Sequence, residues 1–161
     1  MRLAISTNVY LTQSNTQSFR IEASDKITAL LETEVKNGLL TIKWSKNKVR
    51  HSEKIKIYIS MKEVAGLAIS GSADIEIAGT QTANSLSIAI SGSGDVKASE
   101  LQVKNLKTKI SGSGNCKVNV FKRLDATISG SGNVYYKGRP IINGKLAGSE
   151  RIKSIVTIQL T

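Results

Sequence analysis

The sequence predicts an all-β protein, a single-stranded parallel β-helix, and three observations support this prediction. The pentapeptide ISGSG occurs at Ile90–Gly94, Ile110–Gly114 and Ile128–Gly132, with a near copy, ISGSA, at Ile69–Ala73. Apolar and polar residues alternate on both sides of each copy. Each repeat is also too short to hold its strands and a crossover helix. Together these features favour a solenoid in which every repeat makes one coil.

The spacing of the repeat sets the size of a coil. From one leading isoleucine to the next, starting at Ile69, the steps are 21, 20 and 18 residues. A weaker copy, LAGSERI at Leu146–Ile152, follows another 18 residues on. We therefore expect coils of 18–21 residues, with loops of unequal length around a common unit.

Alternation marks the strands within each coil. Before one corner, Leu86, Ile88 and Ile90 fall on one face, and after it Val96 and Ala98 do the same. A period of two residues is typical of half-buried strands. Because every copy enters and leaves its corner in the same register, we expect each strand to lie on its equivalent in the next coil, in parallel.

The ISGSG pentapeptide is expected to form the corner of each coil. Glycine permits a sharp bend because it adopts positive φ without a Cβ clash. Small hydroxyls stacked at coil spacing can bond each other and nearby backbone groups, and Asp or Asn suits the position after them. The predicted corner columns are Gly71, Gly92, Gly112, Gly130 and Gly148; then Ser72, Ser93, Ser113 and Ser131; then Asp74, Asp95, Asn115 and Asn133.

One domain spanning residues 1–161 is expected, because no shift in composition marks a second one. Residues 1–65 would form irregular N-terminal coils, residues 66–153 the SGSG coils, and residues 154–161 a C-terminal strand. Within the first part, Asn8–Gln13 resembles a strand that follows a corner, and Asn37–Gly38 predicts a hairpin. Asp25–Leu31 predicts one helical turn, started by Ser24 or Asp25.

Composition narrows the class of protein. No apolar stretch reaches the roughly 20 residues that cross a bilayer, and no signal peptide is visible, so we expect a cytoplasmic protein or one whose leader has been removed. Cys116 is the only cysteine, which excludes an internal disulfide and a paired-cysteine metal site. It stands where other copies carry Ile or Val, so a small buried hydrophobe is expected. The formal charge of +11 favours anionic partners.

No catalytic set emerges from the residues, and we predict no enzyme, no cofactor and no metal. A phosphate loop needs Gly-Lys-Ser/Thr before a helix, whereas SGSG leads into a strand. His51, the only histidine, lies in a lysine-rich loop where we expect solvated surface. A weak cation site at Asp74 and Asp95 is a minor alternative. Polysaccharide lyases and hydrolases need converging carboxylates, and the outward column after the corner offers one acid, Glu76.

The basic surface is the strongest functional signal in the sequence. One group of candidate binding residues shares the outward column after the corner: Lys97, Lys117, Tyr135 and Lys153. A second group shares the basic segment that begins at Trp44: Lys46, Lys48 and Arg50. Lysines interleaved with an aromatic residue suit an anionic polysaccharide or a cell surface. Nucleic acid is disfavoured because no recognised reading module is present. Alternatively, the lysines only solubilise a long sheet and block edge pairing.

The iterated string I-S-G-S-G-[DN]-V, preceded by NVYLTQ, FRIEA and LLETEVKNGLLTIKW, resembles the bacterial head GIN domain family (putative auto-transporter adhesin), which is common in Bacteroidetes. The resemblance covers Leu3 to Ile152. It implies a right-handed winding. It also implies export to the periplasm, outer membrane or cell surface, although members usually follow an export or lipoprotein signal that this chain lacks. It supplies no catalytic residues.

We therefore expect a non-enzymatic adhesion or structural module of the cell envelope that contacts an anionic glycan or surface. Two alternatives stay open. One is a carbohydrate-active enzyme of the polysaccharide lyase or hydrolase type. The other is a self-assembling envelope scaffold whose copies associate end to end through uncapped coils.

Overall fold

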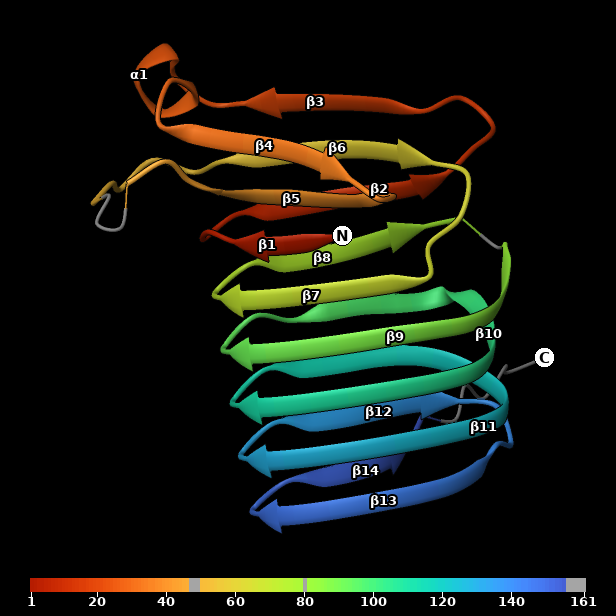
Figure 1. Cartoon of the computed structure of the whole chain (residues 1–161). Coiled ribbons are helices and arrows are strands. Elements are labelled where there is room, and N and C mark those ends of the chain that lie inside the picture. The colour runs from red at the N-terminus through yellow and green to blue at the C-terminus, as the bar shows by residue number, and fades with distance from the viewer. Residues whose placement is uncertain (47–49, 80, 156–161) are drawn as a thin grey trace, which may run out of the picture.

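The computed structural model describes residues 1–46, 50–79 and 81–155 of the chain, and it is built almost entirely of strands (Figure 1). A 14-stranded sheet wraps around one elongated core. The elements are β1 (Arg2–Ala4), β2 (Asn8–Gln13), β3 (Ser18–Glu22), α1 (Asp25–Thr28), β4 (Leu31–Lys36), β5 (Leu39–Trp44), β6 (Lys56–Met61), β7 (Gly66–Gly71), β8 (Asp74–Ala78), β9 (Thr82–Gly92), β10 (Val96–Gly112), β11 (Asn115–Gly130), β12 (Asn133–Lys137), β13 (Ile141–Gly148) and β14 (Arg151–Ser154).

The sheet has two sides that face each other across the core. Side A, in front in Figure 1, runs in the order β4-β5-β1-β7-β9-β10-β11-β13. Side B, behind it, runs in the order β3-β6-β2-β8-β10-β11-β12-β14. Strands β10 and β11 belong to both sides because each bends from side B around to side A. The two sides are therefore parts of one continuous sheet.

The predicted β-helix is confirmed in the repeat region. Gly71 pairs with Gly92, Gly92 with Gly112, Gly112 with Gly130, and Gly130 with Gly148, always between parallel strands. Each pairing joins equivalent residues one coil apart, so the chain makes four turns between the first and last of these glycines. The winding is right-handed, as the path from β7 in front to β8 behind shows (Figure 1).

The N-terminal coils are not stacked in sequence order. Strand β1 lies between β5 and β7, and β2 lies between β6 and β8, so the first coil is inserted between two later ones. Asn8 pairs with Asp74, which confirms its place in the Asp/Asn column. Beyond this coil the parallel pattern stops, because β3 pairs antiparallel with β6 and β4 antiparallel with β5. Irregular coils and a turn at Asn37–Gly38 were expected in this part of the chain, but the antiparallel pairing of β3 with β6 was not.

The local signals in the cap are mostly confirmed. The hairpin between β4 and β5 turns at Asn37 and Gly38, whose φ values are 51° and 74°. The helical turn α1 spans Asp25–Thr28, with the Ser24 hydroxyl accepting a hydrogen bond from the Ile27 N–H at 3.4 Å. The prediction that this turn continues to Leu31 is wrong, because Leu31 begins β4 and pairs with Trp44.

Aliphatic side chains fill the core in columns, one residue per coil. On side A the register aligns Leu3, Ile69, Ile90, Ile110 and Ile128, and all are at most 2% exposed. On side B it aligns Val9, Ile75, Val96, Cys116 and Val134, and all are at most 1% exposed. Each such side chain contributes about 1.5–3 kcal/mol of burial free energy. Cys116 is buried, as its place in this column predicts.

The corners depend on two successive glycine columns. Gly112 has a φ of +124°, and a Cβ there would overlap the carbonyl oxygen of Gly92 on the coil above. Gly114 has an ordinary φ, but a Cβ there would meet the Gly94 carbonyl and the Ile90 side chain. The first glycine is needed for both its backbone conformation and its close approach, the second for close approach alone.

The corner serines contribute through their backbone. Ser113 and Ser131 donate backbone N–H groups to the carbonyls of Gly92 and Gly112, both at 2.9 Å. In the described part of the chain, the side-chain ladder at this corner is formed by the Asp/Asn column, whereas a ladder of serine hydroxyls was expected.

Candidate binding face

The predicted lysine column forms a continuous stripe on the outer surface of side B. Lys97 pairs with Lys117, Lys117 with Tyr135, and Tyr135 with Lys153. Successive members are separated by about 4.8 Å, the spacing of neighbouring strands. The lysines are exposed and Tyr135 is half-buried. We call Lys97, Lys117, Tyr135 and Lys153 the basic stripe.

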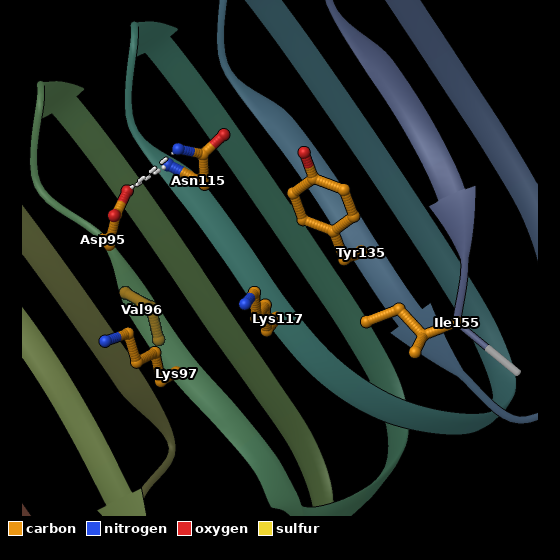
Figure 2. A pocket seen from close by; sticks show the side chains of 7 residues that line it. All are labelled: Asp95, Val96, Lys97, Asn115, Lys117, Tyr135 and Ile155. Atoms are coloured by element: carbon orange, nitrogen blue, oxygen red, sulfur yellow. Dashed lines mark hydrogen bonds between the residues drawn. The ribbon is translucent and has the colours of Figure 1, made fainter. Parts of the chain in front are cut away.

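A shallow depression of about 370 Å³ lies beside this stripe. Figure 2 shows Lys97, Lys117 and Tyr135 on three neighbouring strands, with Ile155 at one end of the group. The depression is lined by Asp95, Val96, Lys97, Asn115, Lys117, Tyr135 and Ile155. It therefore combines two ammonium groups, one aromatic ring and polar amide and carboxylate groups within one open surface.

The stripe lysines form no salt bridge with any other residue that the structure describes. The three salt bridges within the described ranges are Arg20–Glu22, Lys43–Glu32 and Arg123–Asp125. Glu76 is the neighbour of Lys97 in the register, yet it forms none of these pairs. The ammonium groups of Lys97 and Lys117 are thus available to an external anion.

The acidic side of the depression has a structural role. Asp95 accepts hydrogen bonds at Oδ1 from the backbone N–H of Asn115 at 2.7 Å and from its side-chain amide at 3.2 Å (Figure 2). One coil on, Asn115 Oδ1 accepts in the same way from Asn133, at 3.2 and 3.1 Å. Asp74 Oδ1 accepts from the Asp95 N–H at 3.0 Å. These bonds join coil to coil. They also occupy oxygens that the alternative cation site would need, and no group of three metal-ligating side chains occurs within the described ranges.

The outward column continues past Glu76 into an aromatic group that the sequence analysis missed. Tyr10 pairs with Glu76 and with Tyr58, and the two rings are stacked with centroids 5.2 Å apart. The Arg20 guanidinium lies 4.2 Å from the Tyr58 ring centroid. The signal was present in the sequence, because Asn8 in the Asp/Asn column places Tyr10 two residues on, in the column of Glu76.

The second predicted basic group lies elsewhere. Lys46 and Arg50 are exposed in the connection between β5 and β6, near the N-terminal end of the stack. Strands β2 and β8 separate β6 from the strand that carries Lys97. Lys48 lies outside the described residues. The structure therefore does not bring Lys46 and Arg50 to the basic stripe.

The same connection holds His51 in a packed position. Its ring meets the edge of Trp44 with centroids 5.0 Å apart, and Nδ1 lies 2.9 Å from the Glu53 carbonyl oxygen. A fully solvated histidine was expected, and the ring is half-buried. Glu53 accepts hydrogen bonds from Ser24, and these bonds lower the pKa of its carboxyl. They tie the connection to α1.

Three further titratable groups bear on the chemistry of this protein. Burial raises the pKa of the Cys116 thiol to about 12, so the thiol is protonated and unreactive at neutral pH. Lys107 and Asp125 are register neighbours, but the Asp125 carboxylate pairs with Arg123 Nε at 2.8 Å. Its hydrogen bond to Arg123 lowers the pKa of Asp125. None of these three groups therefore offers a reactive nucleophile or a free base beside the basic stripe.

A larger cavity, of about 840 Å³, lies at the N-terminal end of the stack. It opens between β3 and β4, the two strands that cap sides B and A. Its apolar lining includes Phe19, Val35, Leu40, Ile59 and Met61. This cavity could not be predicted from the sequence, because it depends on how the two capping strands are placed.

Comparison with known proteins gives one family. A family model described as "Putative auto-transporter adhesin, head GIN domain" matches residues 2–88 and again residues 81–140. A comparison with curated proteins gives no match. None of the helices in the described ranges is of a length and apolarity that would span a membrane.

Solved structures resemble the chain over nearly its whole length. A putative adhesin from Bacteroides fragilis is 25% identical, with a TM-score of 0.62, and the match covers 96% of this chain and 90% of that one. A putative adhesin from Parabacteroides distasonis is 20% identical with a TM-score of 0.48, covering 93% and 89%. A protein from the same species called a putative lipid binding protein is 21% identical with a TM-score of 0.46, covering 96% and 91%.

Proposed function

We propose a function for this chain, which belongs to the head GIN domain family of putative auto-transporter adhesins. In this proposal it is a non-enzymatic adhesion or structural module that binds anionic polysaccharide through side B. The proposal treats residues 1–161 as one β-helical unit. The stacked coils would supply stiffness, and the basic stripe would supply the contact.

The adjacency of Lys97, Lys117 and Tyr135 beside one depression is the observation that supports this function best. Lys97 and Lys117 lie on strands about 4.8 Å apart, and neither forms a salt bridge with another described residue. Their ammonium groups would attract carboxylate or sulfate groups on a chain that lies along the stack. A half-buried tyrosine offers an apolar ring for contact with a sugar. Asn115 adds an amide that can bond hydroxyls.

A glycan fits this surface better than a nucleic acid. Asp95 lines the same depression, and Glu76 neighbours Lys97 in the stripe's column. A nucleic acid carries a phosphate at every residue, so some phosphates would meet both carboxylates. Hyaluronan carries one carboxylate in every disaccharide, so fewer of its charges would face these acids.

Residence at the cell envelope is part of the proposal. The Bacteroides fragilis relative is called an adhesin, and the matched family is named for auto-transporter adhesins. A protein that contacts polysaccharide outside the cell must be exported to the periplasm, outer membrane or cell surface. Fractionation of cells that express the full-length gene product, with immunoblotting of each fraction, tests this location.

The function is tested by binding to polygalacturonate and hyaluronan, with neutral dextran as a control ligand. The double variant Lys97→Ala/Lys117→Ala should weaken binding about tenfold, since exposed ion pairs contribute up to about 1 kcal/mol each. The matched control is Lys107→Ala/Lys109→Ala, which removes two exposed lysines from side A. Equal losses in both double variants, or equal binding to dextran, would reject side B as the site.

The enzymatic alternative needs its own readout. The same polymers are incubated with the protein, and new reducing ends are measured over time. Binding without chain cleavage agrees with an adhesion module. Cleavage that is lost in Glu76→Gln would instead favour a lyase or hydrolase, because Glu76 is the one carboxylate within the outward column of the stripe.

A further inference from the structure

We propose that copies of this chain associate head to tail, with β13 and β14 of one copy seated against β4 and β3 of the next. This interaction is separate from the polysaccharide function. It rests on three features of the ends of the stack: unpaired strand edges, exposed core-facing side chains and opposite charge.

At the C-terminal end of the stack, the last two described strands each have one unpaired edge. Among the described strands, β13 pairs with β11 alone and β14 with β12 alone, so each has one free edge. Ile142 and Leu146 continue the core columns of Leu124 and Ile128, yet they are 41% and 51% exposed. A long exposed edge with apolar side chains is a template for pairing with another chain.

The N-terminal end also presents unpaired strand edges and exposed apolar side chains. Within the described ranges, β3 pairs with β6 alone and β4 with β5 alone, so this end also offers two free edges, one on each side. The cavity between them is lined by Phe19 and Val35, which are 41% and 71% exposed. The same two sides run through the whole molecule, so the free edges at the two ends lie on matching sides.

Continuing the register past the last coil predicts which residues would meet. On side A, one outward-facing column of register partners runs along the whole stack from Lys145 on β13 to Glu34 on β4. Arg2 and Thr41 are members of this column near its N-terminal end. Lys145 of one copy would therefore face Glu34 of the next. On side B, the same continuation places Arg151 opposite Glu22. Core-facing Ile152 would meet Ile21 by the same rule.

The charges at the two ends are complementary. Strands β3 and β4 at the N-terminal edge carry three acids (Glu22, Glu32 and Glu34) and two bases (Arg20 and Lys36), a net charge of -1 in a chain whose net charge is +11. Strands β13 and β14 at the C-terminal edge carry Lys145, Arg151 and Lys153, a net charge of +3. No salt bridge of the described residues uses Glu34, Lys145 or Arg151, whereas Glu22 is held by Arg20 at 2.6 Å and Glu32 by Lys43 at 3.5 Å. Opposite charges at two ends favour contact between unlike ends and disfavour contact between like ends.

A head-to-tail contact joins two different surfaces of the same chain. Such contacts form a closed ring only if the rotation from one copy to the next adds up to a full circle. Otherwise they produce rows whose length grows with concentration. In such a row the basic stripes of successive copies would continue one another along one side. A polymer ligand would meet several stripes at once, which raises its apparent affinity.

The experiment measures weight-average mass by light scattering as concentration rises to about 1 mM, the range of weak association. One variant reverses the N-terminal end (Glu22→Lys/Glu34→Lys) and a second reverses the C-terminal end (Lys145→Glu/Arg151→Glu). Each alone should weaken association at least about tenfold, because its two ends then carry like charges. An equimolar mixture should associate again, because each end meets its opposite.

The matched control is Lys109→Glu, an exposed residue in the same side A column as Lys145 but in the middle of the stack. It should leave association unchanged. Circular dichroism establishes that every variant is folded. A mass independent of concentration overturns the proposal, and so does association that survives both end reversals, falls equally in Lys109→Glu, or fails to return in the mixture.

Discussion

The Asp95 carboxylate accepts two hydrogen bonds from Asn115 on the next coil, one from its backbone N–H and one from its side-chain amide. Asp95 also lines the depression beside the basic stripe. This residue therefore links the coils that carry Lys97 and Lys117, so the site depends on the corner ladder for its spacing.

Asp95→Ala should lower the free energy of unfolding by about 1–3 kcal/mol, since it leaves the half-buried Asn115 groups without their acceptor. Urea unfolding measures the change. Asp95→Asn keeps an acceptor oxygen and matches the Asn115 and Asn133 positions, so it should recover most of the loss. If Asp95→Ala unfolds at the same urea concentration as the wild type, the ladder does not stabilise the coils.

A second prediction concerns the close approach of glycines at the corner. Gly112→Ala forces an unfavourable φ and an overlap with the Gly92 carbonyl, whereas Gly79→Ala forces a positive φ of 104° with no atom within reach of the new Cβ. Backbone strain alone costs about 1–3 kcal/mol. Gly112→Ala should therefore cost at least about 1 kcal/mol more than Gly79→Ala in urea unfolding. Equal costs would mean that the coils separate freely at this corner.

The buried thiol predicts a specific pH dependence. The pKa of Cys116 is raised to about 12 in the folded protein, whereas an exposed thiol ionises near about pH 8.5. As pH rises, the thiol of the unfolded chain loses its proton first. The contribution of Cys116 to the free energy of unfolding is therefore fully present below about pH 8.5 and declines as pH rises toward 12.

Cys116→Val supplies the control, because Val96 and Val134 occupy the same core column. The difference in free energy of unfolding between wild type and Cys116→Val should shift against the wild type as pH rises from about 8 to about 10.5, because only the unfolded thiol ionises in this range. Iodoacetamide should also leave the folded thiol unmodified at pH 8. Rapid alkylation of the folded protein would show that the thiol is accessible.

Ionic strength should govern ligand binding. Exposed lysines act through screened charge, so affinity for polygalacturonate should fall as salt rises from about 50 to about 500 mM. The Lys97→Ala/Lys117→Ala variant should show a shallower dependence, because it has fewer charges to screen. A binding constant independent of salt would indicate that Tyr135 and polar groups, rather than the lysines, hold the ligand.

The repeat made most of the fold predictable. Equivalent residues recur at nearly constant spacing, so aligning the ISGSG copies correctly gives the register of Gly71, Gly92, Gly112, Gly130 and Gly148. The same alignment places Lys97, Lys117, Tyr135 and Lys153 in one column. Whether these residues bind a ligand is still a prediction.

The N-terminal part could not be predicted in the same way. Insertion of β1 between β5 and β7 is set by contacts between residues far apart in the sequence, and no repeated motif marks them. The separation of Lys46 and Arg50 from the basic stripe follows from this insertion. Tyr58 was missed for the same reason, since its neighbour Tyr10 belongs to the inserted coil.

The proposed function requires a ligand that lies along side B. Backbone amide chemical shifts recorded during titration with a galacturonate oligosaccharide test this directly. The largest changes are expected at Lys97, Lys117 and Tyr135, with little change at Lys107 and Lys109 on side A. Changes centred on Lys46 and Arg50, or spread equally over both sides, would contradict it.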